Sequence, residues 1–255
     1  MPAFVRKGAP ALLGAGTLCA ALLLTACAHP EPTGPAPATT PAPVKSTAAP
    51  ATDARPRTAP RVPGLGPLTQ ARIPATTSQA LVVTGATENS NTATAVLHQR
   101  APDGSWYEAG GPWPAHNALK GWTTDHSAGD LRTPIGVYRI GDAGGRLPDP
   151  GARLPYDQDP QFAISGTGFR GEPLEGSFDH VIAIDYNRVP GRTPLDKERP
   201  LGAAKGGGVW IHVDHGGPTQ ACVALDRDDL RTLLVALDPA AGPVVVMGPA
   251  PELAR

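Results

Sequence analysis

One cysteine near the C-terminal end of the chain follows several possible proton acceptors. The stretch GGGVWIHVDHGGPTQACVAL, residues 206–225, places His212, Asp214 and His215 shortly before Cys222. A free thiol is mostly protonated at neutral pH, and its thiolate is the nucleophile. A nearby imidazole can take the proton and leave a thiolate–imidazolium pair. These residue types therefore predict a nucleophilic cysteine with a histidine base.

The expected local structure brings these side chains together. His212 falls on an expected strand, and the turn HGGPT leads back to Cys222, so the two side chains can come within hydrogen-bonding reach. Asp214 shares a strand face with His212 and could orient the imidazole or be solvated. Backbone N–H groups around Ala221 and Cys222 could form an oxyanion hole.

Two alternatives for these residues stay open. His215 could replace His212 as the base, or it could have a structural role in the glycine-rich turn. The two histidines, Asp214 and Cys222 could instead bind zinc, because catalytic zinc takes three protein ligands. On a strand, however, His212 and His215 point to opposite faces unless the turn starts early. We therefore favour acid–base chemistry with His212 as the base, and expect no metal and no organic cofactor.

The surrounding pattern predicts a mainly β domain with one clear helix after the cysteine. The runs 80–86 and 92–100 flank the turn residues TENSN and predict a hairpin. Residues 226–237 predict a helix, with Asp226 as N-cap and leucines at helical spacing. Long loops at 142–160 and 188–207 could form a cleft. Further strands are expected at 133–141, 178–187, 206–213, 223–225 and 242–248.

The N-terminal segment predicts export and a lipid anchor. Arg6 and Lys7 precede an apolar run, which is typical of a signal peptide over residues 1–26. The run ends in LTAC, residues 24–27, which resembles the bacterial lipobox, so we expect Cys27 to be lipidated and to anchor the protein to a membrane. The remaining cysteine of the mature chain, Cys222, then has no partner for a disulfide.

Composition separates a tether from a folded domain. Residues 28–67 hold 11 of the 31 prolines of the chain, and no aromatic residue occurs between Phe4 and Trp106. Such a segment predicts an extended spacer, so we expect a disordered tether over 27–67 and a catalytic domain over 68–252. The formal net charge of −1 gives no indication of a nucleic-acid partner.

Two ordered motifs resemble a known family. The IH at 211–212 and the TQACVAL at 219–225 resemble the signature of the L,D-transpeptidase catalytic domain, the YkuD-like family of bacterial cell-wall enzymes. That signature is a strand histidine, a loop, and Ser/Thr-His-Gly-Cys before an apolar strand and a helix. The resemblance extends over about residues 115–247. An upstream segment, residues 128–140, resembles the family's Gly-Asp-Gly-x-Thr-Pro-x-Gly-x-Tyr/Phe segment through Gly129, Asp130, Thr133, Pro134, Gly136 and Tyr138.

The resemblance implies a fold, a reaction and partners. It implies an L,D-transpeptidase-type mixed β-sandwich or barrel. Cys222, with His212 as base, would attack a peptidoglycan stem peptide, release D-Ala, and pass the acyl group to an amine to make a 3→3 cross-link. Such a protein would be a membrane-anchored enzyme of cell-wall biogenesis that faces the wall. The residues expected to contact substrate are Tyr138, His215, Thr219, Gln220 and Ala221.

The chain also departs from the family signature. Gln220 and Ala221 stand where the family has histidine and glycine, and Ala224 stands where most members have arginine. A glutamine can form hydrogen bonds but cannot carry a proton at neutral pH. These changes keep two other functions open, an L,D-carboxypeptidase with water as acceptor and a non-catalytic lipoprotein that binds the cell wall.

Overall fold

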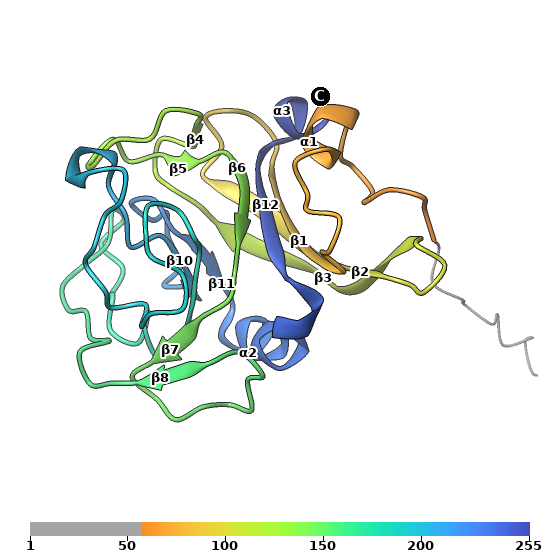
Figure 1. The fold of residues 1–255 in the computed structure, drawn as a ribbon. Coiled ribbons are helices and arrows are strands. Elements are labelled where there is room, and N and C mark those ends of the chain that lie inside the picture. Colours follow the sequence, from red (N-terminus) through yellow and green to blue (C-terminus); the bar gives the residue numbers. More distant parts are fainter. Residues whose placement is uncertain (1–57) are drawn as a thin grey trace, which may run out of the picture. The chain divides into compact units, whose positions relative to one another are not determined.

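The computed structural model describes residues 58–255 of the chain (Figure 1). The expected signal peptide 1–26, the expected lipidation site Cys27 and residues 28–57 of the expected tether lie outside the described residues. Within residues 58–255, no helix combines the length and the apolar character needed to cross a bilayer.

The described unit is mainly β, as the sequence predicts. Ten of its strands form one mixed sheet, in the order β6-β12-β1-β2-β3-β11-β10-β9-β7-β8, and β4 and β5 form a separate pair. The strands are β1 (Gln79–Gly85), β2 (Thr92–Arg100), β3 (Trp106–His116), β4 (Trp122–Thr123), β5 (Thr133–Pro134), β6 (Gly136–Arg139), β7 (Ala143–Gly145), β8 (Tyr156–Gln158), β9 (Val181–Ala183), β10 (Trp210–Val213), β11 (Val223–Leu225) and β12 (Val244–Pro249), with helices α1 (Pro67–Gln70), α2 (Arg227–Ala236) and α3 (Ala250–Leu253) and 3₁₀ turns at Ala203–Lys205 and Pro239–Ala241.

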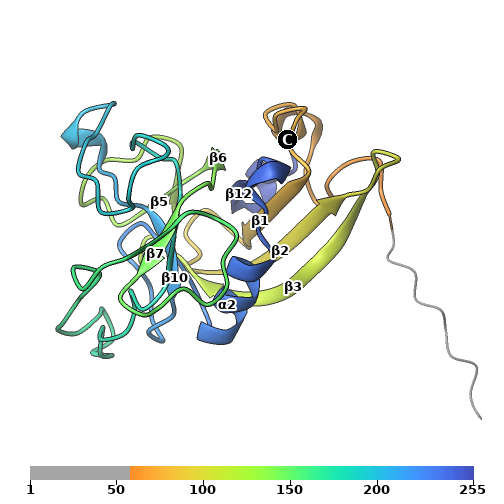
Figure 2. The same ribbon diagram turned by 60° about the horizontal axis from the view of Figure 1, so that its bottom comes forward.

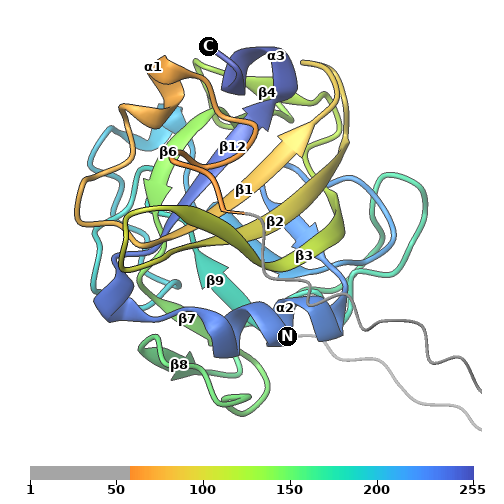
Figure 3. The same ribbon diagram turned by 90° about the vertical axis from the view of Figure 1, so that its right-hand side faces the viewer.

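The large sheet curls round on itself. The segment 136–145 pairs through β6 with β12 and then through β7 with β9, so it joins two strands that are far apart in the sheet order. Helix α2 lies across one end of this curled sheet (Figures 2 and 3) and contributes Leu230, Leu233 and Leu234 to the core. The pairs β1–β12, β10–β11 and β7–β8 are parallel, and the other pairs in the sheet are antiparallel.

Both faces of the strands β1 and β12 are buried, in two different cores. Successive side chains of a strand point to opposite faces. Leu81 and Val83 of β1 therefore join the core inside the curl, whereas Ala80 and Val82 join a smaller core outside it. The apolar run of β12 divides in the same way. Continuous apolar runs, rather than alternation, are what such doubly covered strands require.

The segment before α1 covers the smaller core, so the folded unit begins earlier than residue 68. Val62 is buried in that core, and Ala59 exchanges two backbone hydrogen bonds with Trp106 of β3. At the other end, the Arg255 carbonyl accepts hydrogen bonds from the backbone N–H groups of Leu68 and Thr69. The packed region therefore extends beyond both ends of the expected domain, 68–252.

Several expected elements are confirmed. The hairpin of 80–86 and 92–100 is the antiparallel pair β1–β2, and Asp226 caps α2 by accepting a hydrogen bond from the Asp228 N–H. Other elements differ. The expected strand 178–187 is regular only over Val181–Ala183, and the strand 206–213 only over Trp210–Val213. The long strand β3 was not expected.

Candidate active site

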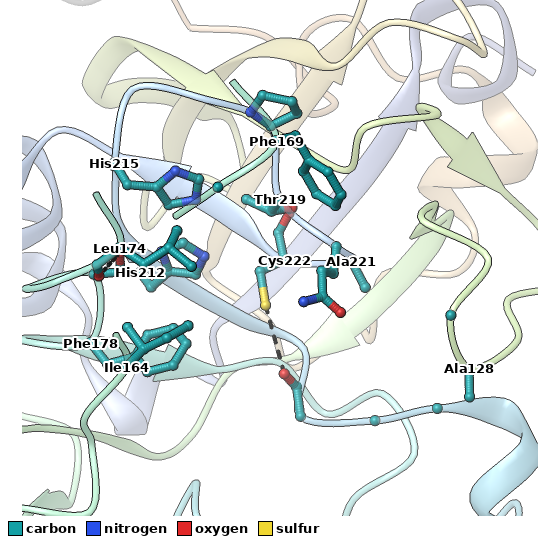
Figure 4. Close-up of a pocket in the computed structure, with 18 of the residues that line it drawn as sticks. Ala128, Ile164, Phe169, Leu174, Phe178, His212, His215, Thr219, Ala221 and Cys222 are labelled. Atoms are coloured by element: carbon teal, nitrogen blue, oxygen red, sulfur yellow. Dashed lines mark hydrogen bonds between the residues drawn. The ribbon is translucent and has the colours of Figure 1, made fainter. Parts of the chain in front are cut away.

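A pocket of about 450 Å³ lies at the ends of β10 and β11 (Figure 4). Its walls are the turn between these strands, the glycine run 206–208, the segment around His126, and a loop that begins near Ile164 and ends at Phe178. The glycine run has positive φ at all three positions, a conformation that L side chains rarely adopt. The sequence GGG therefore allows the backbone itself to line the pocket. Six residues expected in the site line it: His212, His215, Thr219, Gln220, Ala221 and Cys222.

His212 is positioned by the strand β10. Its side chain is 3% exposed, and its backbone is in register with Ala224 of β11. The ring Nδ1 lies 2.9 Å from the Val213 carbonyl, so Nδ1 carries the hydrogen in this bond and Nε2 is left as an acceptor. Burial lowers the pKa of His212 to about 4. The imidazole is therefore neutral at physiological pH and able to accept a proton.

Cys222 lies immediately before β11 and is half-buried. Its thiol donates to the Gly208 carbonyl at 3.7 Å, and the sulfur accepts from the Trp210 N–H at 3.4 Å. Burial raises the pKa of Cys222 to about 11. Desolvation disfavours both charged forms, so these pKa shifts favour a neutral thiol and a neutral imidazole in the resting pair.

The residues just before Cys222 shape the turn and the rim. The buried Thr219 donates its hydroxyl to the Cys222 carbonyl at 2.6 Å, so it holds the turn. Gln220 is exposed at the rim. Among the non-glycine residues of 58–255, only Leu131 and Asn187 have positive φ. Ala221 therefore does not carry the backbone strain that a glycine position could have imposed.

His215 stacks on His212. The ring centroids are 5.8 Å apart and the planes differ by 13°, and both rings lie on the Cys222 side of the pocket (Figure 4). The turn does start early, because β10 ends at Val213, so the two rings lie face to face and not on opposite faces of the strand. Asp214 does not orient either ring. It accepts a hydrogen bond from His116 of β3, with the His116 Nδ1 2.9 Å from Oδ2.

No group of three histidine, cysteine or acidic side chains within residues 58–255 is arranged to hold a metal ion. The expected alternative of a zinc site therefore gains no support from the geometry.

Tyr138 lies outside the pocket. Its hydroxyl donates to the Ile135 carbonyl at 2.9 Å, and its ring packs edge-on against Tyr186. Burial raises the pKa of Tyr138 to about 12. Tyr186 in turn packs against His126, which does line the pocket. The rings of Tyr186 and His126 therefore lie between Tyr138 and the pocket. A substrate contact by the Tyr138 side chain stays a prediction.

Several residues of the site were not expected from the sequence. They are the Gly208 carbonyl that binds the thiol, the Val213 carbonyl that orients His212, Phe178 against the edge of His212, and Glu172 beside His215. Glu172 Oε1 lies 3.2 Å from His215 Nδ1. Glu172 comes from a loop with no periodic pattern, 43 positions before His215, so the sequence offers no signal for this contact.

No model of a known protein family matches this chain, and no curated protein sequence matches it either.

Proposed function

We propose that this protein is a cysteine-dependent peptidyltransferase of the L,D-transpeptidase type that acts on peptidoglycan stem peptides. The observation that carries the proposal is the joint position of Cys222 and His212 in one open pocket, with the Nε2 atom of His212 free to accept a proton. A nucleophile and a neutral base in one cleft are what acyl transfer through a thioester requires. The curled mixed sheet and the helix α2 directly after the Cys222 strand are consistent with a fold of the L,D-transpeptidase type.

The proposed first half-reaction forms a thioester. The Cys222 sulfur attacks the carbonyl of the donor peptide bond while His212 takes the thiol proton. The backbone N–H groups of Ala221 and Cys222 would stabilise the oxyanion. The carbon–nitrogen bond then breaks, and the departing D-Ala amine takes the proton from His212. The neutral resting pair suits this sequence, because the proton needs to move only during the attack.

The proposed second half-reaction releases the acyl group. An amine from a second stem peptide attacks the thioester while His212 takes a proton from that amine, and the carbon–sulfur bond breaks. His212 then returns the proton to the Cys222 sulfur, which restores the thiol. Water in place of the amine would make the protein an L,D-carboxypeptidase. Apolar side chains line the pocket alongside its polar groups and could hold the aliphatic parts of a peptide: Ile164, Phe169, Leu174 and Phe178.

The proposed location is the outer side of a bacterial cell membrane. A lipid on Cys27 would anchor the protein there, and the proline-rich residues 28–57 would separate the domain from the bilayer so that it faces the cell wall.

One observation favours a second candidate, a non-catalytic protein that binds the cell wall. The thiol bonds to the Gly208 carbonyl, and burial raises its pKa, so the resting cysteine is not activated. A pocket can bind a peptide without a reactive sulfur in it.

A carbapenem distinguishes these two functions. The protein without its first 27 residues is incubated with the drug and weighed by mass spectrometry. The transpeptidase proposal predicts one covalent adduct, which is lost in Cys222→Ala and slowed in His212→Gln. A protein that folds, stays free of the adduct, and still binds stem peptides would instead be a binding module.

A further inference from the structure

One of the two stacked histidines of the pocket also contacts a carboxylate. His212 and His215 lie face to face, and Nδ1 at the edge of the His215 ring lies 3.2 Å from Oε1 of Glu172, which belongs to the loop that contributes a wall of the pocket. The side chains of His215 and Glu172 are 6% and 11% exposed. The facing atoms, His215 Nδ1 and Glu172 Oε1, are both buried, and neither has a hydrogen-bond partner within the described residues. Their 3.2 Å approach is therefore a close ion-pair contact rather than an aligned hydrogen bond.

The loop and the turn are shaped to receive the Glu172 carboxylate. A Cβ atom built on Gly217 would lie 1.9 Å from Oε1, and one built on Gly168 would lie 2.2 Å from it. The two glycines thus form a slot that larger residues would fill. The Arg170 N–H donates to Oε2 at 2.7 Å and fixes the second oxygen. Because a carboxylate without these contacts would be costly to bury, the slot indicates a specific role for its charge.

The Glu172 carboxylate is anionic at neutral pH. Hydrogen bonds from the Glu172 N–H and the Arg170 N–H, with a smaller contribution from His215, lower the pKa of Glu172. Asp214 raises the pKa of His212 and His215 lowers it, and Asp214 is already paired with His116. When His212 takes a proton, positive charge appears on the ring stack, and within residues 58–255 the one ion-pair contact of Glu172 is with His215 of that stack.

We propose that Glu172 is a positioning residue that acts through His215 to hold the His212 imidazole and to offset its charge as it accepts the Cys222 proton. This inference rests on the proposed role of Cys222 as nucleophile. Neither Glu172 nor His215 takes up or releases the proton in this scheme. The pair supplies a fixed ring surface and a fixed negative charge, so removal of the Glu172 carboxylate slows the reaction of the thiol without changing ligand binding.

The test compares Glu172→Gln with Glu175→Gln. Glu175 is exposed on the same loop, so this control removes the same charge without touching the slot. We measure the rate at which iodoacetamide alkylates Cys222 near neutral pH, by mass spectrometry, and the melting temperature of each variant. Loss of the negative charge beside the ring stack predicts a rate lower by about 10-fold or more in Glu172→Gln and an unchanged rate in Glu175→Gln.

Two further variants separate positioning from general damage. Glu172→Asp keeps the charge and should recover part of the rate. His215→Gln should slow alkylation as much as Glu172→Gln does, and the double variant should be no slower, because the two residues act as one unit. Carbapenem affinity before the covalent step should stay the same in Glu172→Gln and Glu172→Asp, because the residues that line the pocket do not include Glu172.

The outcomes are distinguishable from a failure of the proposed function. If His212→Gln slows alkylation but a folded Glu172→Gln reacts at the wild-type rate, this inference is overturned and the His212–Cys222 pair stands. If neither variant changes the rate, the pair itself is not functional. If Glu172→Gln does not fold, a wild-type rate in His215→Gln would still overturn the inference. The inference would also be overturned if the two substitutions lowered the alkylation rate additively in the double variant.

Discussion

At the scale of residues, the protonation states of Cys222 and His212 decide how the site can work. Burial raises the pKa of the thiol to about 11 and lowers the pKa of the imidazole to about 4, so both shifts favour the neutral forms. A preformed ion pair would give a thiolate that reacts with any electrophile. A neutral pair reacts when an electrophile lies close enough for the proton to move to His212 during attack, whether that electrophile is a bound substrate or a small reagent that enters the pocket.

This difference predicts the pH at which the thiolate forms in the resting protein. Ultraviolet absorbance of the thiolate should stay absent at neutral pH and rise near pH 11, rather than near the value of 9.0 for a free thiol. The physical cause is the loss of hydration of the sulfur on burial. Cys222→Ala removes the signal and is the control. Thiolate absorbance already present at pH 7 would show that the pair is ionised at rest.

The sequence could predict the chemistry of this site but not all of its contacts. The types and spacing of His212, Thr219 and Cys222 are local, because one strand and one turn bring them together. The pairing of Asp214 with His116 depends on β3 lying beside β11, and the pairing of His215 with Glu172 depends on a loop from another part of the chain. Such contacts follow from the tertiary fold and leave no pattern in a single sequence.

At the scale of elements, the turn from β10 to β11 and the loop that ends at Phe178 must fit together closely. Gly217 in the turn and Gly168 in the loop have no room for a side chain beside the Glu172 carboxylate. The way the turn packs against the loop therefore sets the position of Glu172. Because Glu172 contacts His215, the same packing also sets the position of His215.

We expect Gly217→Ala to reproduce the kinetic effect of Glu172→Gln in a folded protein. The new Cβ would lie 1.9 Å from Glu172 Oε1, and the flexible carboxylate can move away where backbone could not. Alkylation of Cys222 should therefore slow by about 10-fold or more, with only a small change in melting temperature. Gly141→Ala is the matched control, because a Cβ there meets nothing within 4 Å. A wild-type rate in Gly217→Ala would contradict the fit described here.

The elements themselves were predictable where one local signal dominates. The hairpin β1–β2 follows from two β-rich runs around turn residues, and α2 follows from its cap and its leucine spacing. Strand β3 was missed because Gly110, Gly111 and Pro112 interrupt it, and such residues normally mark a turn. Its partner β2 accommodates them through register shifts between Ala95 and His98, so tertiary pairing overrides the local signal.

At the scale of the whole molecule, the curled sheet buries several histidines together with its apolar core. His98 on β2, His180 before β9 and His212 on β10 are each less than 5% exposed. Burial lowers the pKa of all three. Each buried ring is therefore neutral in the folded protein at pH values where the same ring in the unfolded chain is already charged.

This arrangement predicts that the protein loses stability in mild acid. Below pH 6.5 the unfolded chain binds protons that the folded protein does not, so the free energy of unfolding falls with pH. For His212 the loss continues to about pH 4 and amounts to about 3 kcal/mol. Denaturant unfolding at several pH values between 7 and about 4 measures this fall in the free energy of unfolding.

The variant His212→Gln isolates how much the His212 ring contributes to the loss of stability in mild acid. Glutamine has no charge to acquire, so the variant should show a shallower decline than the wild type over the same range. The raised pKa of Asp185 acts in the opposite direction, but it is common to both proteins and cancels in the comparison. Equal slopes would mean that His212 takes up its proton in the folded state as readily as in the unfolded chain. The neutral resting base on which the proposed chemistry depends would then not exist.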